Sequence, residues 1–418
     1  MTRHLIRLVW NRKRQNLLLA FEIFLSYLVL FAVVFFAVTG LANWQHPLGF
    51  SIERLWGVDL DYPERGVPQQ LIGVDEPGKL AEVQAARTRA AARLQEMFAA
   101  LRALPNVEAV SASFATAYEG SEWGGNIGEP TRAYAMFNFA DDEFANVVGL
   151  NVTAGRWFSK ADDAAPYLPV VINRHLAREL YGDADPVNRV LAPPNPRQPE
   201  SRVVVGVIDE FRQQGELTTP GNYAFYRLPP GHRAGAPLPT ALTIRVKPGT
   251  TAEFEETVVR TLQNLAPDWR FTPYDLQAKR QDALLKVLIP IGGLTIVSVF
   301  LLLMVALGLM GVVWQNVTRR FQEFGLRRAN GATAHDVRRQ VLAELAILTS
   351  LAVLVGVALI VQLPVLSLVD PDIRPPAAVF ITSIVTSVAV IYLLTLLCGW
   401  YPSRLATQIH PAEALHYE

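Results

Sequence analysis

Three residue patterns in the sequence could carry chemistry, and each is incomplete. Residues 73–80, GVDEPGKL, have the spacing of a phosphate-binding loop, but Leu80 stands where a hydroxyl group would hold Mg²⁺ and Pro77 lacks a backbone N–H. The seven histidines, His175 among them, are dispersed and have no metalloprotease spacing. A single cysteine, Cys398, excludes an intrachain disulfide and a thiolate metal cage. The sequence therefore predicts a protein without a catalytic site, cofactor or metal of its own.

The composition of the chain indicates that part of it lies in lipid and part in water. Of the 418 residues, 51% are apolar and 18% are charged, which places the chain between a soluble enzyme and a protein made mainly of membrane helices. The 38 basic and 38 acidic residues balance, so the net charge gives no indication of a nucleic acid partner. Local rather than net charge must therefore govern any interaction.

Four apolar runs can cross a membrane, since a bilayer core requires roughly 20 mainly apolar residues in a helix. We predict transmembrane helices at residues 17–41, 283–318, 341–369 and 377–400. Few helix breakers follow Pro290, so the second helix is expected to continue past the membrane through Thr318. The remaining segments are residues 1–16, 42–282, 319–340, 370–376 and 401–418. The predicted fold is a membrane protein with four transmembrane α-helices and a large domain inserted between helices 1 and 2.

The basic residues predict the orientation of these helices, because Lys and Arg near the ends of a span remain on the cytoplasmic side. Basic residues precede the first helix, fill residues 319–340 and follow the fourth helix, whereas the loop at 370–376 carries two acidic residues and one basic residue. Both termini are then cytoplasmic, and residues 42–282 are extracytoplasmic. The first apolar run is longer than that of a signal peptide and is expected to be a retained anchor. Glu22, within it, is expected to be paired near the headgroups.

Residues 42–282 have the alternating helical and β-branched patterns of a mixed α/β domain. A helix is predicted at 80–104 and a strand in PNVEAVSASF, and a strand, a helix and a second strand in ALTIRVKPGT, TAEFEETVVRTLQNL and APDWRFTPYDL. These two parts are predicted to be two halves of one α/β layer, separated by an insertion at about 110–235 that contains a strand and helix at 168–183 and a buried strand at 201–211. The domain is therefore expected to have two subdomains. Four aromatic residues of the insertion are placed in loops and are expected to pack locally: Trp123, Tyr134, Phe137 and Phe139.

The segment RRFQEFGLRRANGATAHDVRRQ, residues 319–340, has more structure than a positively charged flank requires. Phe321 and Phe324 predict a short amphipathic helix, and Asn330 and Gly331 predict a turn with positive φ. Thr333 and Asp336 predict a capping box. A short helix of this kind on a membrane helix is suited to docking on a partner.

The stretch EFGLRRANGATAHDVRRQVLAE resembles the cytoplasmic motif of FtsX-type ABC transporter permeases, E-x-G-L-x-R-A-x-G-A-[ST] with a downstream Glu, here Glu344. The tail YPSRLATQIHPAEALHYE is similar to the C-terminal motif of that family, carried here by Tyr401, Pro402, Ala406, Pro411, Glu413, Ala414 and Leu415. Between the first two helices, the turn at Gly155, Arg156 and Phe158 and the strands around it resemble the extracytoplasmic domain of MacB-like members. Asn188 departs from their pattern, in which a glycine is usual.

The resemblance implies four spans, a large domain between the first two, and a dimer that works with a pair of separate ABC ATPase subunits. It assigns the charged segment as a coupling helix and turn that dock on the ATPase, through Phe321, Glu323, Phe324, Gly325, Leu326, Arg327, Arg328, Gly331, Ala332 and Thr333. ATP and Mg²⁺ then belong to the ATPase, which is not expected to be fused to this chain. The second permease is an identical copy or a paralogue in contact with membrane lipid, and the family also allows a periplasmic adaptor. The implied location is the bacterial cytoplasmic (inner) membrane.

The resemblance leaves three functions open. The leading hypothesis is a permease subunit that moves a periplasmic peptide, drug or lipophilic cargo by mechanical transmission, since no run of polar residues crosses the spans to form an aqueous path. The second is an ATP-driven regulator of an envelope enzyme, a role for which the outer domain is larger than necessary. The third is an anchored sensor without an ATPase, which the coupling motif disfavours.

Overall fold

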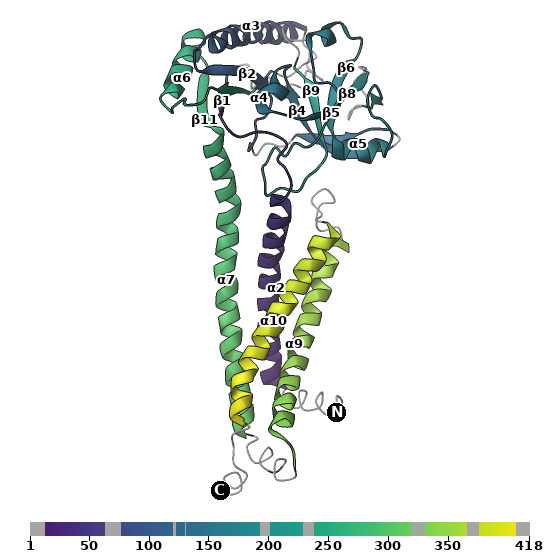
Figure 1. Ribbon diagram of the computed structural model, residues 1–418, viewed down its shortest axis with the longest axis vertical. Coiled ribbons are helices and arrows are strands. Elements are labelled where there is room, and N and C mark those ends of the chain that lie inside the picture. Colours follow the sequence, from purple (N-terminus) through teal and green to yellow (C-terminus); the bar gives the residue numbers. More distant parts are fainter. Residues whose placement is uncertain are drawn as a thin grey trace. The chain divides into compact units, whose positions relative to one another are not determined.

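The computed structural model describes residues 13–62, 77–119, 123–129, 131–192, 201–228, 238–319, 326, 331–365 and 376–406. The chain divides into two compact units (Figure 1). The helical unit comprises Met1–Ala42 and Val287–Glu418, and the α/β unit comprises Asn43–Lys286. The chain therefore enters and leaves the α/β unit through two helices that belong mainly to the helical unit.

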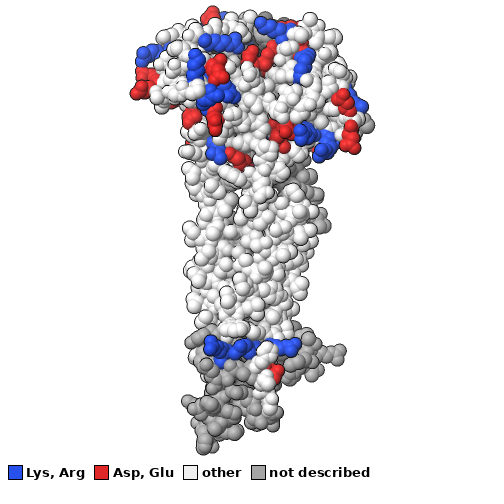
Figure 2. Space-filling model, viewed as in Figure 1, with Lys and Arg blue, Asp and Glu red and all other residues white. Residues whose placement is uncertain are grey.

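The helical unit is built from four long helices: α2 (Lys13–Trp44), α7 (Leu276–Arg319), α9 (Ala334–Val365) and α10 (Ala377–Ala406). Within the described residues, these four are long and apolar enough to cross a membrane. The predicted arrangement of four membrane-crossing helices with a large domain between the first and the second is confirmed. Figure 2 shows few charged side chains along this unit and a row of Lys and Arg side chains at one end.

Helix α7 is the longest element and passes Pro290 without a break. The sequence places its start at 283, whereas the structure extends it back to Leu276, directly after strand β11 (Arg270–Asp275). At its other end it reaches Arg319, one residue beyond the predicted Thr318. A proline inside a helix removes one backbone hydrogen bond, a loss that membrane helices tolerate. The sheet is thus joined to the apolar span without a linker.

The helices pack through small residues and shared hydroxyl groups. The ring of Tyr27 on α2 fills the space beside Gly356 on α9, where an added Cβ atom would be 2.5 Å from the ring. Thr349 of α9 and Thr395 of α10 are both buried and share a hydrogen bond of 3.1 Å between their hydroxyl groups. Glu22 of α2 faces α7, where a glycine leaves room for the carboxylate. These are contacts that hold membrane helices together in the absence of a hydrophobic driving force.

The α/β unit contains one 11-stranded mixed sheet and its helices. Strand order in the sheet is β11-β1-β10-β2-β4-β9-β6-β8-β5, with β3 beside β4 and β7 beside β8. The elements other than α7 and β11 are, in chain order, β1 (Leu55–Asp61), α3 (Pro77–Arg102), β2 (Val107–Ser113), β3 (Gly124–Ile127), β4 (Ala133–Ala140), α4 (Phe144–Val148), β5 (Val152–Gly155), η2 (Lys160–Ala164), β6 (Leu168–Asn173), α5 (Arg174–Tyr181), β7 (Val190–Leu191), β8 (Arg202–Ile208), β9 (Tyr223–Arg227), β10 (Ala241–Val246) and α6 (Phe254–Leu265). The predicted mixed α/β domain is confirmed.

The two halves of the sheet have separate hydrophobic cores. Helices α3 and α6 cover strands β1, β2 and β10, and Met97, Leu101 and Leu262 are fully buried between them. Helix α5 covers the other half, where Leu176 packs against Ile172. A third cluster around α4 adjoins both halves. Each half can therefore keep its own shape while the boundary between them carries fewer contacts.

The boundary between the halves lies between β2 and β4, which pair only through Ser113 and Ala140. Beyond that pair a carboxylate takes the place of a neighbouring strand, because Asp141 accepts a hydrogen bond of 2.8 Å from the backbone N–H of Ala112. The N–H of Asp141 donates in return to the carbonyl group of Ala112 at 3.1 Å. One residue thus closes the open edge of β2 at this point.

The prediction that three of the aromatic residues lie in loops is wrong. Tyr134, Phe137 and Phe139 lie on β4, whose sequence AYAMFNFA has no β-branched residue to mark it as a strand. Local packing is confirmed for Phe137, which is buried, and for Phe139, whose ring lies 5.5 Å from that of Trp123. Trp123 and Tyr134 remain 45% and 39% exposed. Three of the four aromatic residues therefore belong to the sheet, and Trp123 directly precedes β3 (Gly124–Ile127).

Asn188 retains the turn that a glycine would be expected to form. Its φ is 65°, in the left-handed region that asparagine tolerates better than most residues. Its backbone N–H donates to the carbonyl group of Val204 at 2.8 Å. The departure from the expected glycine leaves the local fold intact.

Candidate functional site

The segment with the predicted docking residues is described in part. Leu326 is helical and exposed, and Gly331, Ala332 and Thr333 are also described. The other predicted docking residues lie outside the described residues: Phe321, Glu323, Phe324, Gly325, Arg327 and Arg328. Of the C-terminal motif, Tyr401 and Pro402 belong to α10, while four residues lie outside the described part: Pro411, Glu413, Ala414 and Leu415.

The predicted turn and capping box before α9 are present in the structure. Gly331 has a φ of 96°, which is favourable only for glycine. Thr333 accepts at its hydroxyl group from the N–H of Asp336 at 3.2 Å, and the Asp336 carboxylate accepts from the N–H of Thr333 at 2.9 Å. These reciprocal bonds satisfy N–H groups that have no partner inside the helix. The end of the charged segment therefore has a defined geometry where it joins α9.

Replacing Thr333 by alanine is expected to weaken the first turn of α9 by about 1 kcal/mol, because the threonine hydroxyl accepts from the N–H of Asp336 and donates to its carboxylate, and both bonds are lost. Hydrogen exchange of the amides at residues 334–337 would then be roughly fivefold faster. Thr261→Ala is the matched control, since the exposed Thr261 hydroxyl donates to a carbonyl group inside α6 and caps nothing. Equal protection of residues 334–337 in Thr333→Ala and the unaltered chain would contradict the assignment.

Glu344 lies in α9 near the end of the helix that follows the charged segment. The side-chain amide of Gln340 donates to its carboxylate at 3.2 Å. Six residues earlier, the guanidinium of Arg338 lies 5.1 Å from the centre of the Trp400 ring on α10. The first turns of α9 are thus packed on the last turns of α10, at the end where Figure 2 shows the basic residues.

A buried arginine in the β8–β9 loop (residues 209–222) binds the end of α2. Arg212 donates from Nη1 to the carbonyl groups of Asn43 and His46, both at 2.9 Å. From Nη2 it donates to the carbonyl group of Glu216 at 2.6 Å and to that of Thr218. Burial lowers the pKa of Arg212, an effect that the carboxylates of Glu210 and Glu216 oppose. The guanidinium therefore caps a helix with charge-assisted hydrogen bonds.

The same loop binds the start of α7. Arg280, in the second turn of α7, donates from Nε to the Glu216 carboxylate at 2.5 Å. The Tyr118 hydroxyl donates to the other oxygen of that carboxylate at 3.2 Å, and burial raises the pKa of Tyr118. The Arg280 guanidinium lies 5.7 Å from the ring centre of Trp44 at the end of α2. We call this set the junction cluster: Asn43, Trp44, Tyr118, Arg212, Glu216 and Arg280.

A second set of contacts binds α7 to the other half of the sheet. Lys279 donates from Nζ to the Thr116 hydroxyl at 3.0 Å and lies 3.8 Å from the Tyr274 ring centre. The Tyr274 hydroxyl donates to the same Thr116 oxygen at 2.8 Å. The ring of Tyr274 occupies the space that a side chain at Gly57 would need on the neighbouring strand β1. The first turn of α7 is thus attached to β1, β11 and the segment after β2.

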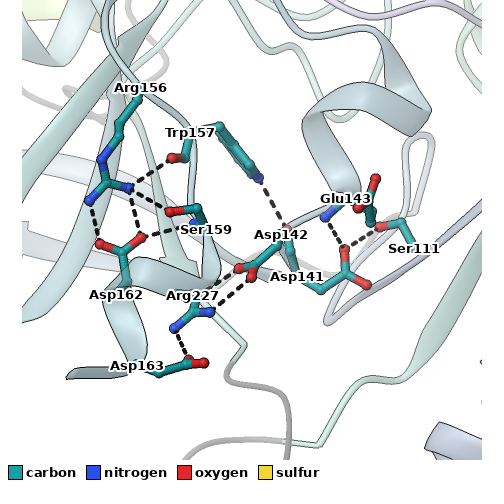
Figure 3. A network of polar contacts seen from close by, with 10 residues as sticks. All are labelled: Ser111, Asp141, Asp142, Glu143, Arg156, Trp157, Ser159, Asp162, Asp163 and Arg227. Atoms are coloured by element: carbon teal, nitrogen blue, oxygen red, sulfur yellow. Dashed lines mark hydrogen bonds and ion pairs between the residues drawn. The ribbon is translucent and has the colours of Figure 1, made fainter. Parts of the chain in front are cut away.

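Figure 3 shows a further polar network in the α/β unit, which includes the predicted GRWF turn. Arg156 donates to both carboxylate oxygens of Asp162, at 2.5 and 2.7 Å, and this hydrogen bonding raises the pKa of Arg156. Arg227 donates twice to Asp142, at 2.7 and 2.8 Å, and once to Asp163 at 2.6 Å. Each guanidinium is matched by carboxylates, so the network fixes the segments around β4, η2 and β9.

Asp141, in the same network, is the titratable group most relevant to pH. Burial raises the pKa of Asp141 to about 6 although it accepts bonds from the hydroxyl of Ser111 and the N–H groups of Ala112 and Glu143. A raised folded-state pKa means that the folded chain binds the proton more tightly than the unfolded chain. The contribution of Asp141 to stability is therefore complete below the ordinary value of 3.8 and is lost as pH rises through about 6.

Asp141→Asn is expected to remove that dependence on pH. The contribution of Asp141 to the free energy of unfolding of the α/β unit should decrease between about pH 4 and pH 6. The decrease in the total free energy of unfolding over this range should therefore be about 1–3 kcal/mol smaller in the variant than in the unaltered chain. Denaturant unfolding at a series of pH values, followed by tryptophan fluorescence, measures the difference. Parallel pH profiles for the two proteins would show that Asp141 has an ordinary pKa.

The sequence also predicts no phosphate loop at residues 73–80 and no metal site. The last four residues of the phosphate-loop-like stretch, 77–80, form the first turn of α3. Among the described residues, no group of three or more His, Cys, Asp or Glu side chains could hold a metal ion. His175 is held by Glu210, at 3.0 Å from Nε2, and this hydrogen bond raises the pKa of His175.

Comparisons with known proteins match both units. Residues 63–261 match the MacB-like periplasmic core domain, and residues 295–411 match the FtsX-like permease C-terminal domain. The pyoverdine export ATP-binding/permease protein PvdT of Pseudomonas syringae pv. tomato is 26% identical over 290 residues, which are 66% of this chain and 42% of PvdT. The macrolide export ATP-binding/permease protein MacB of Escherichia coli K12 is 28% identical over 297 residues, 68% of this chain and 44% of MacB. The chain therefore spans less than half the length of these relatives.

Among solved structures, the periplasmic region of MacB from Actinobacillus actinomycetemcomitans aligns with 56% of this chain and 94% of its own length, at 12% identity and a TM-score of 0.36.

Proposed function

Because the chain belongs to the MacB/FtsX-like family of ABC transporter permeases, we propose that it is a membrane subunit whose α/β unit is moved by ATP hydrolysis. We propose that a partner ATPase hydrolyses the ATP. Residues 73–80 are not assigned to hydrolysis, because they lack the hydroxyl group of a phosphate loop and run into helix α3. We place the α/β unit outside the cytoplasmic (inner) membrane of a bacterium and both termini inside. The basic residues at one end of the helical unit, Arg338, Arg339 and Arg404 among them, support that orientation.

The observation that carries this proposal is the continuity of α7. The helix has 44 residues, begins directly after β11 and ends at Arg319, where the predicted coupling segment begins. A hydrogen-bonded helix transmits displacement along its axis, whereas a flexible linker would absorb it. A push on the coupling segment by an ATPase would therefore reach the sheet directly.

The relatives indicate only the chemical class of the cargo. Their names describe export of pyoverdine and of macrolides, and we propose a peptide, drug or lipophilic compound that the α/β unit moves. In the helical unit the hydroxyl groups of Thr349 and Thr395 are buried and bond to each other, and we propose a route for the cargo outside the bundle. The working unit would contain two permeases, identical or paralogous, and two ATPase subunits, with a periplasmic adaptor as a further partner.

The test is reconstitution of the full chain in nanodiscs with candidate ATPases from the same source. We expect one ATPase to bind and its hydrolysis rate to change when the permease is present and again when cargo is added. Binding without any response to small molecules, but with a response to an envelope enzyme, would replace transport by regulation of that enzyme. If no ATPase binds, the proposal is wrong and the charged segment serves another partner.

A further inference from the structure

We propose that Arg212 and Glu216 are positioning residues that hold the end of α2 and the start of α7 on one loop, so that both helices move the sheet together. This inference rests on the proposed function, since helix motion is what the contacts would transmit. All the residues concerned lie in the α/β unit: Asn43 and Trp44 are the last residues of α2, and Arg280 lies in the second turn of α7.

The attachment of α2 depends on the planar shape of a guanidinium. The last carbonyl groups of a helix have no partner inside it, and Arg212 donates from one nitrogen to that of Asn43, near the end of α2, and to that of His46, two residues beyond the helix. Its second terminal nitrogen donates to two carbonyl groups of its own loop, at Glu216 and Thr218. A lysine has one nitrogen and cannot span both pairs. Asn43 adds a bond in the opposite direction, from its side-chain amide to the carbonyl group of the loop residue Leu217 at 3.0 Å.

The attachment of α7 depends on a buried carboxylate. Glu216 binds Arg280 with its side chain while its backbone carbonyl group accepts from Arg212. Its side chain is 8% exposed, and separating the pair would leave a buried charge without its partner. The guanidinium of Arg280 also lies over the ring of Trp44, so the two helices touch each other as well as the loop. A displacement of one helix is therefore resisted by the other.

The position of the β8–β9 loop determines which strands a displacement of the helix ends would move. Strands β8 and β9, which the loop connects, lie on either side of β6 in the sheet. Movement of the junction cluster would thus be passed to two strands of the same half. The other half receives α7 directly through Thr116, Tyr274 and Lys279. Helix α7 therefore contacts both halves, and the junction cluster is what adds α2 to the half that contains β8 and β9.

The test measures the distance between the two helix ends in the full chain, without any ATPase. Spin labels are placed at Gln45→Cys and Gln281→Cys, both exposed positions beside the junction cluster, in a Cys398→Ala background. Double electron–electron resonance in nanodiscs then gives the distribution of distances. We expect one narrow distribution for the otherwise unaltered chain, and one about twofold broader for Arg212→Lys and for Glu216→Gln.

Arg245→Lys is the matched control. The Arg245 guanidinium also donates two hydrogen bonds to a backbone carbonyl, that of Val147, at 2.8 and 2.5 Å, but Val147 lies on α4 and neither residue belongs to the junction cluster. Arg245→Lys should leave the distribution narrow. If Arg212→Lys fails to fold, Arg280→Gln replaces it, because that side chain is 27% exposed and its loss leaves a smaller buried defect. Arg280→Lys, which keeps the charge, should restore most of the narrow distribution.

The outcomes separate this inference from the proposed function. Distributions equally narrow in every variant would overturn the inference, even if an ATPase binds and is stimulated by the chain. Broadening in the cluster variants alone supports it, even if no ATPase binds and the proposed function fails. Where an ATPase does bind, Arg212→Lys should retain binding but lose at least half of the cargo-dependent change in hydrolysis, because the docking segment is intact and transmission is not.

Discussion

Glu323→Lys is expected to reduce the affinity of the chain for its ATPase by about tenfold or more while leaving folding and membrane insertion unchanged. The substitution reverses a charge in the stretch EFGLRRANGAT, which resembles a docking motif, and reversing a charge at a complementary interface creates repulsion in place of attraction. Affinity can be measured by surface plasmon resonance of the ATPase on nanodiscs that contain either protein. The α/β unit provides the check on folding through its unfolding transition.

Arg339→Glu is the matched control for that measurement. Arg339 is exposed on α9 at the same end of the helical unit, outside the predicted docking residues. Its charge reversal should alter the affinity severalfold less than Glu323→Lys. A Glu323→Lys protein that fails to insert would show that Glu323 is structural, and one that binds the ATPase normally would remove residues 319–330 from the interface.

Gly155→Ala is expected to destabilise the α/β unit by about 3–5 kcal/mol, a large part of the stability of an ordinary domain. Gly155 pairs with Gly206 across β5 and β8, and its φ is 65°. An added Cβ atom would strike the carbonyl oxygen of Val205 and lie 2.9 Å from the Cα atom of Gly206. Because both neighbours are backbone atoms, the two strands would have to separate. Denaturant unfolding followed by tryptophan fluorescence measures the effect.

Gly182→Ala separates the cost of the steric clash from the cost of the positive φ. Gly182 has a φ of 62°, but a Cβ atom there would have nothing within 4 Å. Its substitution carries the conformational penalty alone, about 1 kcal/mol. A Gly155→Ala protein no less stable than Gly182→Ala would mean that the approach of β5 to β8 is looser than the structure shows.

The four membrane helices could be predicted from the sequence because the requirement is local: each must be long and apolar enough by itself. The start of α7 was missed because LQAKRQDALLK is polar, and a search for apolar runs finds lipid-facing residues rather than helix ends. In the α/β unit, strands β6, β8 and β10 were found from their β-branched runs, whereas β4 and β9 were not. Their sequences, AYAMFNFA and YAFYR, are stabilised as strands by partners distant in the chain.

The difference between local patterns and partners distant in the chain also explains which parts of the candidate site could be predicted. The capping box at Thr333 could be predicted because its two residues are three positions apart. The junction cluster could not, since its members come from the end of α2, the segment after β2, the β8–β9 loop and the start of α7. In the sequence, Arg212 and Glu216 follow the predicted strand at 201–211, and Glu210 lies at its end. Nothing in their spacing distinguishes them from solvated loop charges, and only the fold buries them.

The length of α7 has a further consequence, for amplitude. At about 1.5 Å per residue, its 44 residues extend about 66 Å. A tilt of about 5° at one end of such a rod displaces the other end by about 6 Å, close to one helical turn. If α7 moves as one rod, as the proposed function requires, a small adjustment at one end would be amplified into a movement large enough to change which residues touch at the other.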